Sequence, residues 1–399
     1  MPHFCLYQYD AAPVGFGLFH NLPVVSTDHI LSMNSPHNTL PQMNQIDASR
    51  ICILKPSALG DVVQSLPILP ALKARFPEAQ ISWVIRDSFA NLLEGHPLID
   101  EIIPFNRSSS VRYWLSFLKK LKQRQFDLAI DLQGLLRTGV MTAATRARWR
   151  IGLESAREGS HLAYNLTIPE TSRSVPAYQK YWNVADAFGT GETCRDTQIF
   201  ISDADKAWAR DILSAGAKSC PTLAIHAGAQ WITKRWPPES FAAVGAKAIR
   251  HFRCNIVLVG TNDERPLTSQ IEKLLHKFVP TGRVLNLAGQ TTLKQLAALL
   301  METDYLLTND SGPMHLAAGL GTPVTGIFTC TSSLRSGPPG DQHELVSTNV
   351  DCAASYQKRC PKRGPQNLCC MDELDVTRAW QALYRLITRQ NAQRDSQAA

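Results

Sequence analysis

The feature that most constrains the fold is a repeated alternation of short apolar runs, typical of buried strands, with longer segments of helical periodicity. In the first half the strand-like runs occupy residues 51–54, 81–85, 101–105, 128–132 and 150–153. Helical patterns separate them, as at residues 112–124. Alternation of this kind predicts parallel strands joined by crossover helices. The first half is therefore predicted to form a doubly wound α/β sheet.

The same alternation restarts after a more polar, helical stretch. Strand-like runs occupy residues 222–226, 255–260, 284–287, 304–308 and 324–328, and helical patterns lie near 238–251, 265–278, 292–302 and 313–320. We therefore expect two doubly wound, Rossmann-like domains. Because ligands of open parallel sheets bind beyond the carboxyl ends of the strands, the site is expected in a central cleft that the two domains face.

Domain boundaries follow from these patterns and from composition. Residues 1–48 are rich in Pro, Asn, His and Ser without periodicity, and they predict a disordered or atypical extension. We expect an N-terminal domain over residues 49–205, a C-terminal domain over 206–375, and a final helix and tail over 376–399. No apolar run reaches the roughly 18 residues of a membrane span, and no signal peptide is evident, so we expect a cytoplasmic protein.

Positive charge is concentrated in the first half of the chain. Between Ile51 and Lys180 there are 17 Lys and Arg against 11 Asp and Glu, most of the formal net charge of +7. This surplus indicates an anionic partner, for which a phosphorylated lipid or a membrane surface serves as well as nucleic acid. A solvated helix face remains the alternative for the cluster Lys119, Lys120, Lys122 and Arg124.

Four of the ten cysteines, Cys352, Cys360, Cys369 and Cys370, gather in a polar, proline-containing segment near the C-terminus. They could form a metal site or a disulfide-prone flap, although the paired spacing of structural zinc sites is absent. Ordinary unreactive thiols are the third interpretation. We expect no metal.

The first candidate motif follows the first strand and reads KPSALGD, residues 55–61. It lacks the glycine pattern of a dinucleotide-binding fingerprint, and the chain has no P-loop motif. Gly60 permits close approach of a ligand, and Asp61, where a helix begins, could accept a proton from a sugar hydroxyl. Spacing alone leaves open whether Asp61 is this base or only the cap of its helix. Pro67 and Pro70 predict distortion of that helix.

The second motif, DSGPMHLAAGL, covers residues 310–320. Asp310 or Ser311 can cap a short helix whose first turn accommodates Pro313. Free amides near Ser311 and Gly312 and the positive end of the helix dipole favour a diphosphate, and His315 could add a hydrogen bond. An ordinary strand-to-helix connection with a packed histidine is the alternative.

Three further motifs follow strand-like runs. The first, HAGAQWITKRW, begins at His226 and offers Thr233 and the cation of Lys234 for a departing diphosphate, or is a plain surface loop. GTNDE, residues 260–264, could place Glu264 against a nucleoside or could simply start a helix. DLQGLLR, residues 131–137, could aim Gln133 and Arg137 at an acceptor or form a structural turn.

In this order the motifs resemble glycosyltransferase family 9, the ADP-heptose:lipopolysaccharide heptosyltransferases, over about residues 50–390. KPSALGD looks like the family's opening motif, whose aspartate is taken as the catalytic base. TKRW looks like its loop with a lysine on the donor phosphates, and DSGPMHLAAGL like its donor-binding turn. DLQGLLR and SAREG, residues 155–159, look like acceptor-side segments of the heptosyltransferase I branch, whereas the cysteine segment looks like the heptosyltransferase II branch.

The resemblance implies a GT-B fold and inverting transfer of a heptose or a related sugar. Catalysis is expected from Asp61 and Lys234. The donor side is expected to comprise His226, Thr233, Lys234, Glu264, Asp310, Ser311, Gly312 and His315. The acceptor side is expected to comprise Ser57, Gly60, Gln133, Arg137 and Arg157.

The same resemblance implies the partners. We expect an ADP-sugar donor, ADP-heptose first, with no required cofactor, and an anionic lipopolysaccharide inner-core acceptor. Peripheral contact with the inner face of the cytoplasmic membrane is expected, and a nucleic-acid partner is not. A sugar-nucleotide epimerase or hydrolase on the same fold, and an inactive carbohydrate-binding relative, are the alternatives.

Overall fold

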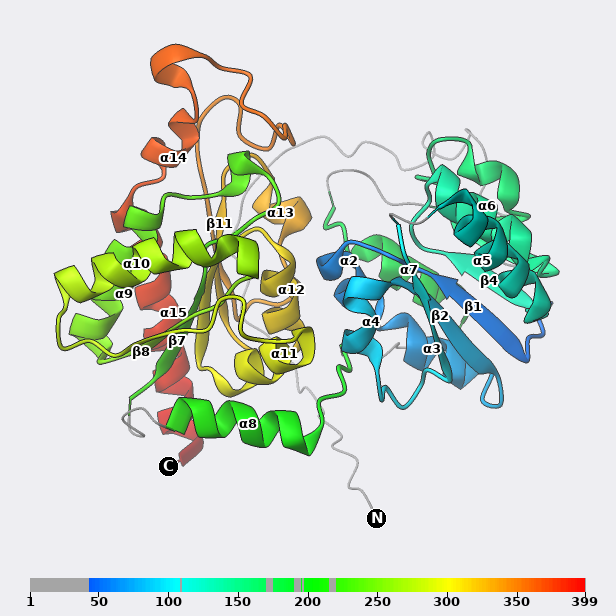
Figure 1. Cartoon of the computed structure of the whole chain (residues 1–399), viewed down its shortest axis with the longest axis horizontal. Coiled ribbons are helices and arrows are strands. Elements are labelled where there is room, and N and C mark those ends of the chain that lie inside the picture. The colour runs from blue at the N-terminus through cyan, green and yellow to red at the C-terminus, as the bar shows by residue number, and fades with distance from the viewer. Residues whose placement is uncertain are drawn as a thin grey trace, which may run out of the picture. The chain divides into compact units, whose positions relative to one another are not determined.

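In the computed structural model, the part of the 399-residue chain that is described comprises residues 43–107, 110–169, 175–189, 195, 197–214 and 220–398. The first sheet has six parallel strands (Figure 1), β1 (Arg50–Leu54), β2 (Gln80–Arg86), β3 (Glu101–Phe105), β4 (Leu128–Asp131), β5 (Trp149–Leu153) and β6 (Leu166–Ile168). Their order is β3-β2-β1-β4-β5-β6, so the direction of winding reverses between β1 and β4. Ligands of such sheets bind beside this reversal.

Helices cover both faces of the first sheet. One core contains residues of α2 (Leu59–Ser65), α3 (Ile68–Arg75), α4 (Asp87–Leu93) and α7 (Gln179–Ala187). The other core contains residues of α5 (Val111–Gln123) and α6 (Leu136–Thr145), and η3 (Ser160–Ala163) packs against α6. The distortion predicted from Pro67 and Pro70 is confirmed, because α2 ends before Pro67 and α3 starts after it.

The second sheet repeats this topology. Its parallel strands are β7 (Thr222–His226), β8 (Asn255–Leu258), β9 (Val284–Asn286), β10 (Tyr305–Asn309), β11 (Val324–Phe328) and β12 (Glu344–Ser347), in the order β12-β11-β10-β7-β8-β9. The reversal now lies between β7 and β10. The two doubly wound, Rossmann-like halves predicted from the sequence are therefore confirmed.

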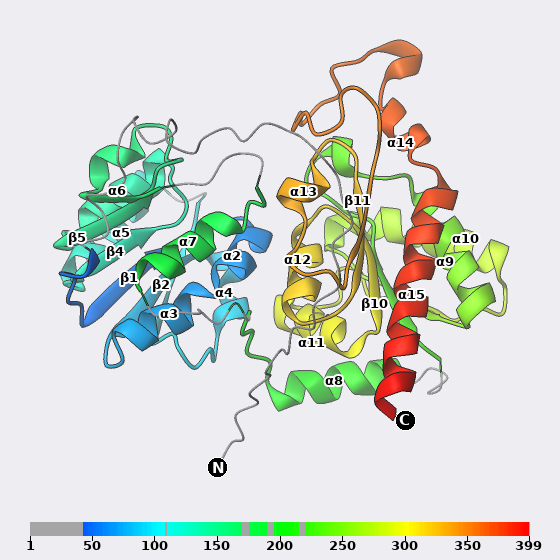
Figure 2. The same cartoon turned by 180° about the vertical axis from the view of Figure 1, so that it is seen from behind.

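The helices of the second half are α8 (Asp203–Ser214), α9 (Pro238–Phe252), α10 (Arg265–Phe278), α11 (Leu293–Glu302), α12 (Gly312–Gly319), α13 (Ser333–Ser336), α14 (Cys369–Glu373) and α15 (Val376–Ala398). Short 3-10 turns η4 (Ile232–Lys234), η5 (Asn262–Glu264) and η6 (Gly364–Gln366) lie between them. Helix α15 packs on α9, β11 and β12, and Figure 2 shows it running across the second sheet.

The expected domain boundaries can be compared with the observed helices and cores. Most of the extension predicted for residues 1–48 lies outside the described residues, but Met43, Ile46 and Ala48 are buried in the first core. The boundary expected between residues 205 and 206 falls inside α8, which packs against α11. The described helices include none with the apolar run that a bilayer crossing requires.

Candidate functional site

The KPSALGD segment joins β1 to α2 at the carboxyl edge of the first sheet. Ala58 is the N-cap residue of α2, and its N–H donates to Oδ2 of Asp61 at 3.3 Å. Asp61 therefore supports the start of the helix from its third position and is not the N-cap residue itself. This contact uses Oδ2 of the carboxylate, and supporting the helix in this way is compatible with a chemical role for Asp61.

Two further groups hold the Asp61 carboxylate. The Tyr181 hydroxyl donates to Oδ1 at 2.9 Å, and the Lys55 ammonium lies 3.5 Å from Oδ2. Burial alone would raise the pKa of Asp61, but the charge of Lys55, followed by that of Lys180, outweighs it. The pKa of Asp61 therefore lies well below its usual range, and the side chain, still 36% exposed, is ionised at neutral pH.

Lys55 is the buried centre of this arrangement. Its side chain is only 2% exposed, and burial lowers its pKa to about 8. The ammonium donates to Oε1 of Gln133 at 3.2 Å and lies 5.4 Å from the centre of the Tyr181 ring. Asp131 fixes the Gln133 loop by accepting the backbone N–H groups of Gln133 and Gly134. Lys55 thus connects the segments after β1 and β4 across the reversal of the sheet.

The other predicted acceptor residues lie around this edge. Arg137 and Arg157 are exposed. The Arg137 guanidinium lies 5.7 Å from the Phe105 ring centre, and the Arg157 N–H donates to the carbonyl of Gly134. Ser57 is half-buried beside α2. The contacts among the described residues join Gln133, through Lys55, to Asp61, but they join neither arginine to it.

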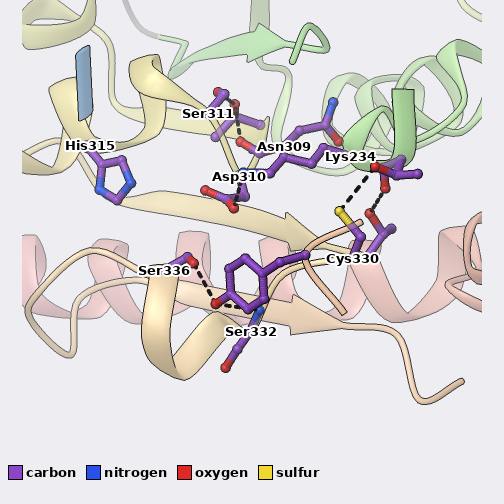
Figure 3. A network of polar contacts seen from close by, with 12 residues as sticks. Lys234, Asn309, Asp310, Ser311, His315, Cys330, Ser332 and Ser336 are labelled. Atoms are coloured by element: carbon purple, nitrogen blue, oxygen red, sulfur yellow. Dashed lines mark hydrogen bonds and ion pairs between the residues drawn. The ribbon is translucent and has the colours of Figure 1, made fainter. Parts of the chain in front are cut away.

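In the second sheet a short ion pair joins Lys234 to Asp310. The Lys234 ammonium donates to Oδ2 of Asp310 at 2.6 Å, with side chains 18% and 6% exposed. The same ammonium lies 4.9 Å from the Trp231 ring centre. Lys234 ends η4, after β7, and Asp310 follows β10 (Figure 3). The pair therefore holds a cation at the reversal of the second sheet.

The start of α12 lies next to this pair. Ser311 is its N-cap residue, yet its hydroxyl makes no capping hydrogen bond. Instead the hydroxyl lies 3.1 Å from Nδ1 of His226 and 3.2 Å from the Thr308 hydroxyl. The first turn of a helix has N–H groups without partners inside the helix, and these attract anions. Gly312 begins this turn, one residue before the predicted start of the helix at Pro313.

Glu264 and His226 form a second cluster. The Glu264 carboxylate accepts the Thr261 N–H at 2.8 Å and lies 3.6 Å from Nε2 of His226. Burial alone would raise the pKa of Glu264, but its contacts with His226 and Thr261 lower it to about 2. A Cβ atom at Gly228 would lie 1.7 Å from Glu264 Oε1, so glycine is needed there for this approach.

Thr233 makes two contacts within the protein. It is buried, and its hydroxyl donates to the carbonyl of Gln357 at 2.7 Å, while Cys330 Sγ lies 3.3 Å from the same hydroxyl. The Lys358 ammonium lies 5.6 Å from the Trp231 ring centre. These contacts tie the loop of Lys234 to the segment that contains the clustered cysteines.

His315 connects the two halves of the chain. Its Nδ1 lies 3.0 Å from Nε2 of Gln64, one turn after Asp61 in α2. A Cβ atom at Gly60 would lie 2.4 Å from the His315 ring, so the ring packs directly on the Gly60 backbone. Burial lowers the pKa of His315. A cavity of about 450 Å³ beside this contact is lined by Gln64 and His315 together with Tyr178 and Trp182.

The clustered cysteines show no sign of a metal site. Cys370 is buried, Cys352, Cys360 and Cys369 are half-buried, and all four are free thiols. Among the described residues, no group of three or more His, Cys, Asp or Glu could hold a metal ion.

Sequence reasoning missed Lys55, Tyr181 and Gln357 as site residues. Lys55 opens the quoted motif, and its signal was a cation at the carboxyl end of an otherwise apolar strand. Tyr181 and Gln357 reach the site from 120 and 124 residues away in the sequence, and no local pattern marks either one.

The chain is similar to known proteins over most of its length. Residues 114–364 match glycosyltransferase family 9 (heptosyltransferase). Lipopolysaccharide core heptosyltransferase OpsX of Haemophilus influenzae is 30% identical over 301 residues, which cover 74% of this chain and 84% of that protein. Lipopolysaccharide heptosyltransferase 1 of Pseudomonas aeruginosa is 27% identical over 331 residues, 78% of this chain and 87% of that one.

Among solved structures, ADP-heptose lps heptosyltransferase II of E. coli superposes with a TM-score of 0.69 at 21% identity, covering 86% of this chain and 99% of that one. At this identity the likeness concerns the fold. It confirms the predicted GT-B class of two Rossmann-like domains.

The lowered pKa of Glu264 predicts a pH-dependent contribution to stability. Its folded-state pKa of about 2 lies below the ordinary 4.5, so the ionised carboxylate stabilises the fold above pH 4.5 and this contribution is lost as the pH falls towards 2. We expect Glu264→Gln to lower the free energy of unfolding by about 1–3 kcal/mol at pH 7. Below pH 4.5 the difference in unfolding free energy between wild type and variant, here called the gap, should become smaller. Urea unfolding at a series of pH values measures it. The exposed neighbour Asp263, changed to Asn, is the control, and a gap that does not vary with pH would contradict the assignment.

Proposed function

Because the chain belongs to glycosyltransferase family 9, the heptosyltransferases, we propose that it transfers heptose from ADP-heptose to an acceptor of the lipopolysaccharide inner core. The family and the enzyme class predicted from the motifs are confirmed. The donor and the acceptor follow from the names of the relatives, which include a lipopolysaccharide core heptosyltransferase and an ADP-heptose heptosyltransferase. These names favour transfer over the epimerase, hydrolase and inactive alternatives.

The observation that carries the proposal is the fixed cation at the start of α12. Asp310 holds Lys234 beside Ser311 and Gly312, where the positive end of a helix dipole already favours anions. A nucleoside diphosphate gains negative charge as it leaves a sugar, and preorganised positive groups stabilise that charge in the transition state. Asp310 thereby orients Lys234, while Ser311, Gly312 and His315 face the phosphates. With this positive charge supplied by the protein, we propose that no metal ion is required.

Asp61 supplies the base in this mechanism. The acceptor hydroxyl oxygen attacks the anomeric carbon, the bond from that carbon to the diphosphate oxygen breaks, and ADP leaves with the bonding electrons. Asp61 takes the hydroxyl proton, and attack opposite the leaving group inverts the configuration. A carboxylate with a lowered pKa is a weak base. It serves here because the hydroxyl becomes strongly acidic as its oxygen bonds to the sugar, and because Lys55 keeps Asp61 ionised.

The remaining predicted residues take supporting roles. We assign the nucleoside of the donor to Glu264, which follows β8, and to His226, the last residue of β7, because ligands bind at this end of the strands. Thr233 holds the Lys234 loop in place through Gln357. On the acceptor side, Arg137 and Arg157 offer exposed cations for phosphate or carboxylate groups, near Ser57, Gly60 and Gln133. A lipid-linked acceptor would place the enzyme at the inner face of the cytoplasmic membrane.

Donor identity is tested by incubating the enzyme with ADP-heptose, UDP-sugars and GDP-sugars, each with and without a lipopolysaccharide inner-core acceptor. We expect ADP release that depends on the acceptor and heptosylated product only with ADP-heptose. ADP release at the same rate without acceptor would support a hydrolase instead. Preference for a UDP- or GDP-sugar would overturn the donor assignment.

Replacing the proposed base should remove chemistry but not binding. Asp61→Asn keeps the shape of the side chain and loses the proton acceptor, so we expect kcat to fall by about 10²–10⁴-fold. The affinity for ADP, measured by calorimetry, should stay within about twofold of wild type, because the variant leaves Lys234 and α12 untouched. Turnover close to that of the wild type would sink the assignment of Asp61.

The ion pair of Asp61 with Lys55 predicts a change in the pH profile. In the wild type, the pKa of Asp61 lies below the range in which kcat/KM is measured, so Asp61 adds no acid limb. Lys55→Met removes the cation that lowers this pKa most, so the pKa of Asp61 should rise and an acid limb should appear between pH 4 and 6. Lys180→Met, which removes a less buried cation, should give a smaller shift. Superimposable profiles for all three proteins would contradict this role of Lys55.

A further inference from the structure

Exposed apolar side chains gather on one face of the first half. Eleven large hydrophobic residues are exposed in the described part of the chain, and five of them lie on α5, α6 and η3. These five are Val111, Leu115, Leu136, Val140 and Leu162, with exposures of 75%, 61%, 54%, 38% and 84%. Apolar side chains gathered on one face indicate a binding surface, whereas single ones need no explanation.

The three elements form a continuous surface. Helix α5 packs on α6 and α6 on η3, and Figure 1 shows α5 and α6 side by side over the first sheet. Val111 and Leu115 are one helical turn apart, as are Leu136 and Val140, so each pair shares one side of its helix. A Cβ atom at Gly139 would lie 2.8 Å from Ser160, so this glycine lets η3 approach α6 closely. We call the exposed side of α5, α6 and η3 the outer face.

Positive charge follows the same elements. Residues 110–163, which contain α5, α6 and η3, have ten Lys and Arg against four Asp and Glu. Residues 55–105, which contain the helices α2, α3 and α4 of the opposite face, have four against six. Among the described residues, one cation of residues 110–163 forms an ion pair with a carboxylate. This is Arg124, which pairs with Glu101. The charge surplus of the first half therefore lies in the part of the chain that contains the outer face, and α5, α6 and η3 themselves contain five Lys and Arg and no Asp or Glu.

The outer face adjoins the proposed acceptor residues. Arg137 lies on α6 between Leu136 and Val140, and the Arg157 N–H is bonded to Gly134 just before α6. An acceptor with a lipid part and a polar sugar head needs both environments next to each other. Here the apolar side chains and the proposed sugar site share one helix.

We propose that the outer face docks on the surface of an anionic phospholipid bilayer, with its five apolar side chains entering the interface and its cations contacting the headgroups. Apolar residues flanked by Lys and Arg suit such a surface. A second copy of the chain fits worse, since two faces of the same positive sign repel each other. Nucleic acid would use the cations but leave the apolar side chains in water. The inference rests on the proposed function for one point only, the lipid-linked acceptor.

The test is sedimentation of the full-length protein with phosphatidylcholine vesicles, with and without phosphatidylglycerol. We expect binding that requires phosphatidylglycerol and weakens with salt. Each cation near an anionic surface contributes about fivefold in affinity, so Arg112→Glu/Lys119→Glu should lower binding by at least about 25-fold. Leu115→Glu/Leu162→Glu should lower it by about tenfold or more. The matched controls Lys273→Glu/Lys277→Glu on α10 and Leu334→Glu on α13, of similar exposure to Leu115, should bind like the wild type.

The proposal would be overturned if the wild type bound vesicles equally well with and without phosphatidylglycerol. It would also be overturned if the outer-face variants bound like the controls. A wild-type dimer that the outer-face variants break would overturn it in favour of a second copy. A second assay, transfer from ADP-heptose to a deacylated, soluble acceptor, tests the proposed function without the membrane and so separates it from the docking proposal. Outer-face variants should retain that transfer at the wild-type rate, and its absence in a wild type that still binds vesicles would defeat the transferase assignment alone.

Discussion

The ion pair between Lys55 and Asp61 is the interaction on which the first half of the site depends. Lys55 is buried where the winding of the sheet reverses, and it contacts the segments after β1 and β4 as well as the Tyr181 ring. A buried ammonium is costly unless opposite charge and hydrogen bonds compensate it. Asp61 and Gln133 supply that compensation. The ion pair with the buried Lys55 ammonium therefore fixes the position of the proposed base. The same ion pair makes Asp61 a weak base. A weak base suits this reaction, because the acceptor hydroxyl becomes acidic as its oxygen bonds to the sugar.

In the second sheet, a lysine proposed to contact the donor is held in place by similar contacts. Lys234 would be a mobile cation on an exposed loop, but Asp310, Trp231 and the Thr233–Gln357 hydrogen bond confine it. Because Asp310 immediately precedes the N-cap residue of α12, the lysine and the helix dipole act on the same small volume. Both halves thus place one paired, immobilised charge at the reversal of their sheet, an anion in the first and a cation in the second.

The sequence predicted the positions along the chain better than the contacts between distant segments. Strands 101–105, 222–226 and 324–328 were predicted to the residue, because each is an apolar run with clear ends. The edge strands β6 and β12 were missed because each is short, with three residues in β6 and four in β12. The segments that follow the strands could be predicted to share one edge, because parallel strands bring their carboxyl ends together. Tyr181, Gln357 and the pairing of Lys234 with Asp310 depend on tertiary contacts that no local pattern encodes.

The position of the outer face bears on how a soluble donor and a lipid-linked acceptor could meet. Helices α5 and α6 cover the face of the first sheet opposite α2, while Asp61 and the Gln133 loop lie at its carboxyl edge. An acceptor anchored in a bilayer against α5 and α6 would therefore reach Asp61 around the β4–α6 connection, passing Gln133, Arg137 and the loop of Arg157. Gly134, with φ 65°, lies in this connection, and Gly139, within α6, allows Ser160 to approach the helix closely. Along this path the sugar head of such an acceptor would leave the interface while its lipid stayed in it.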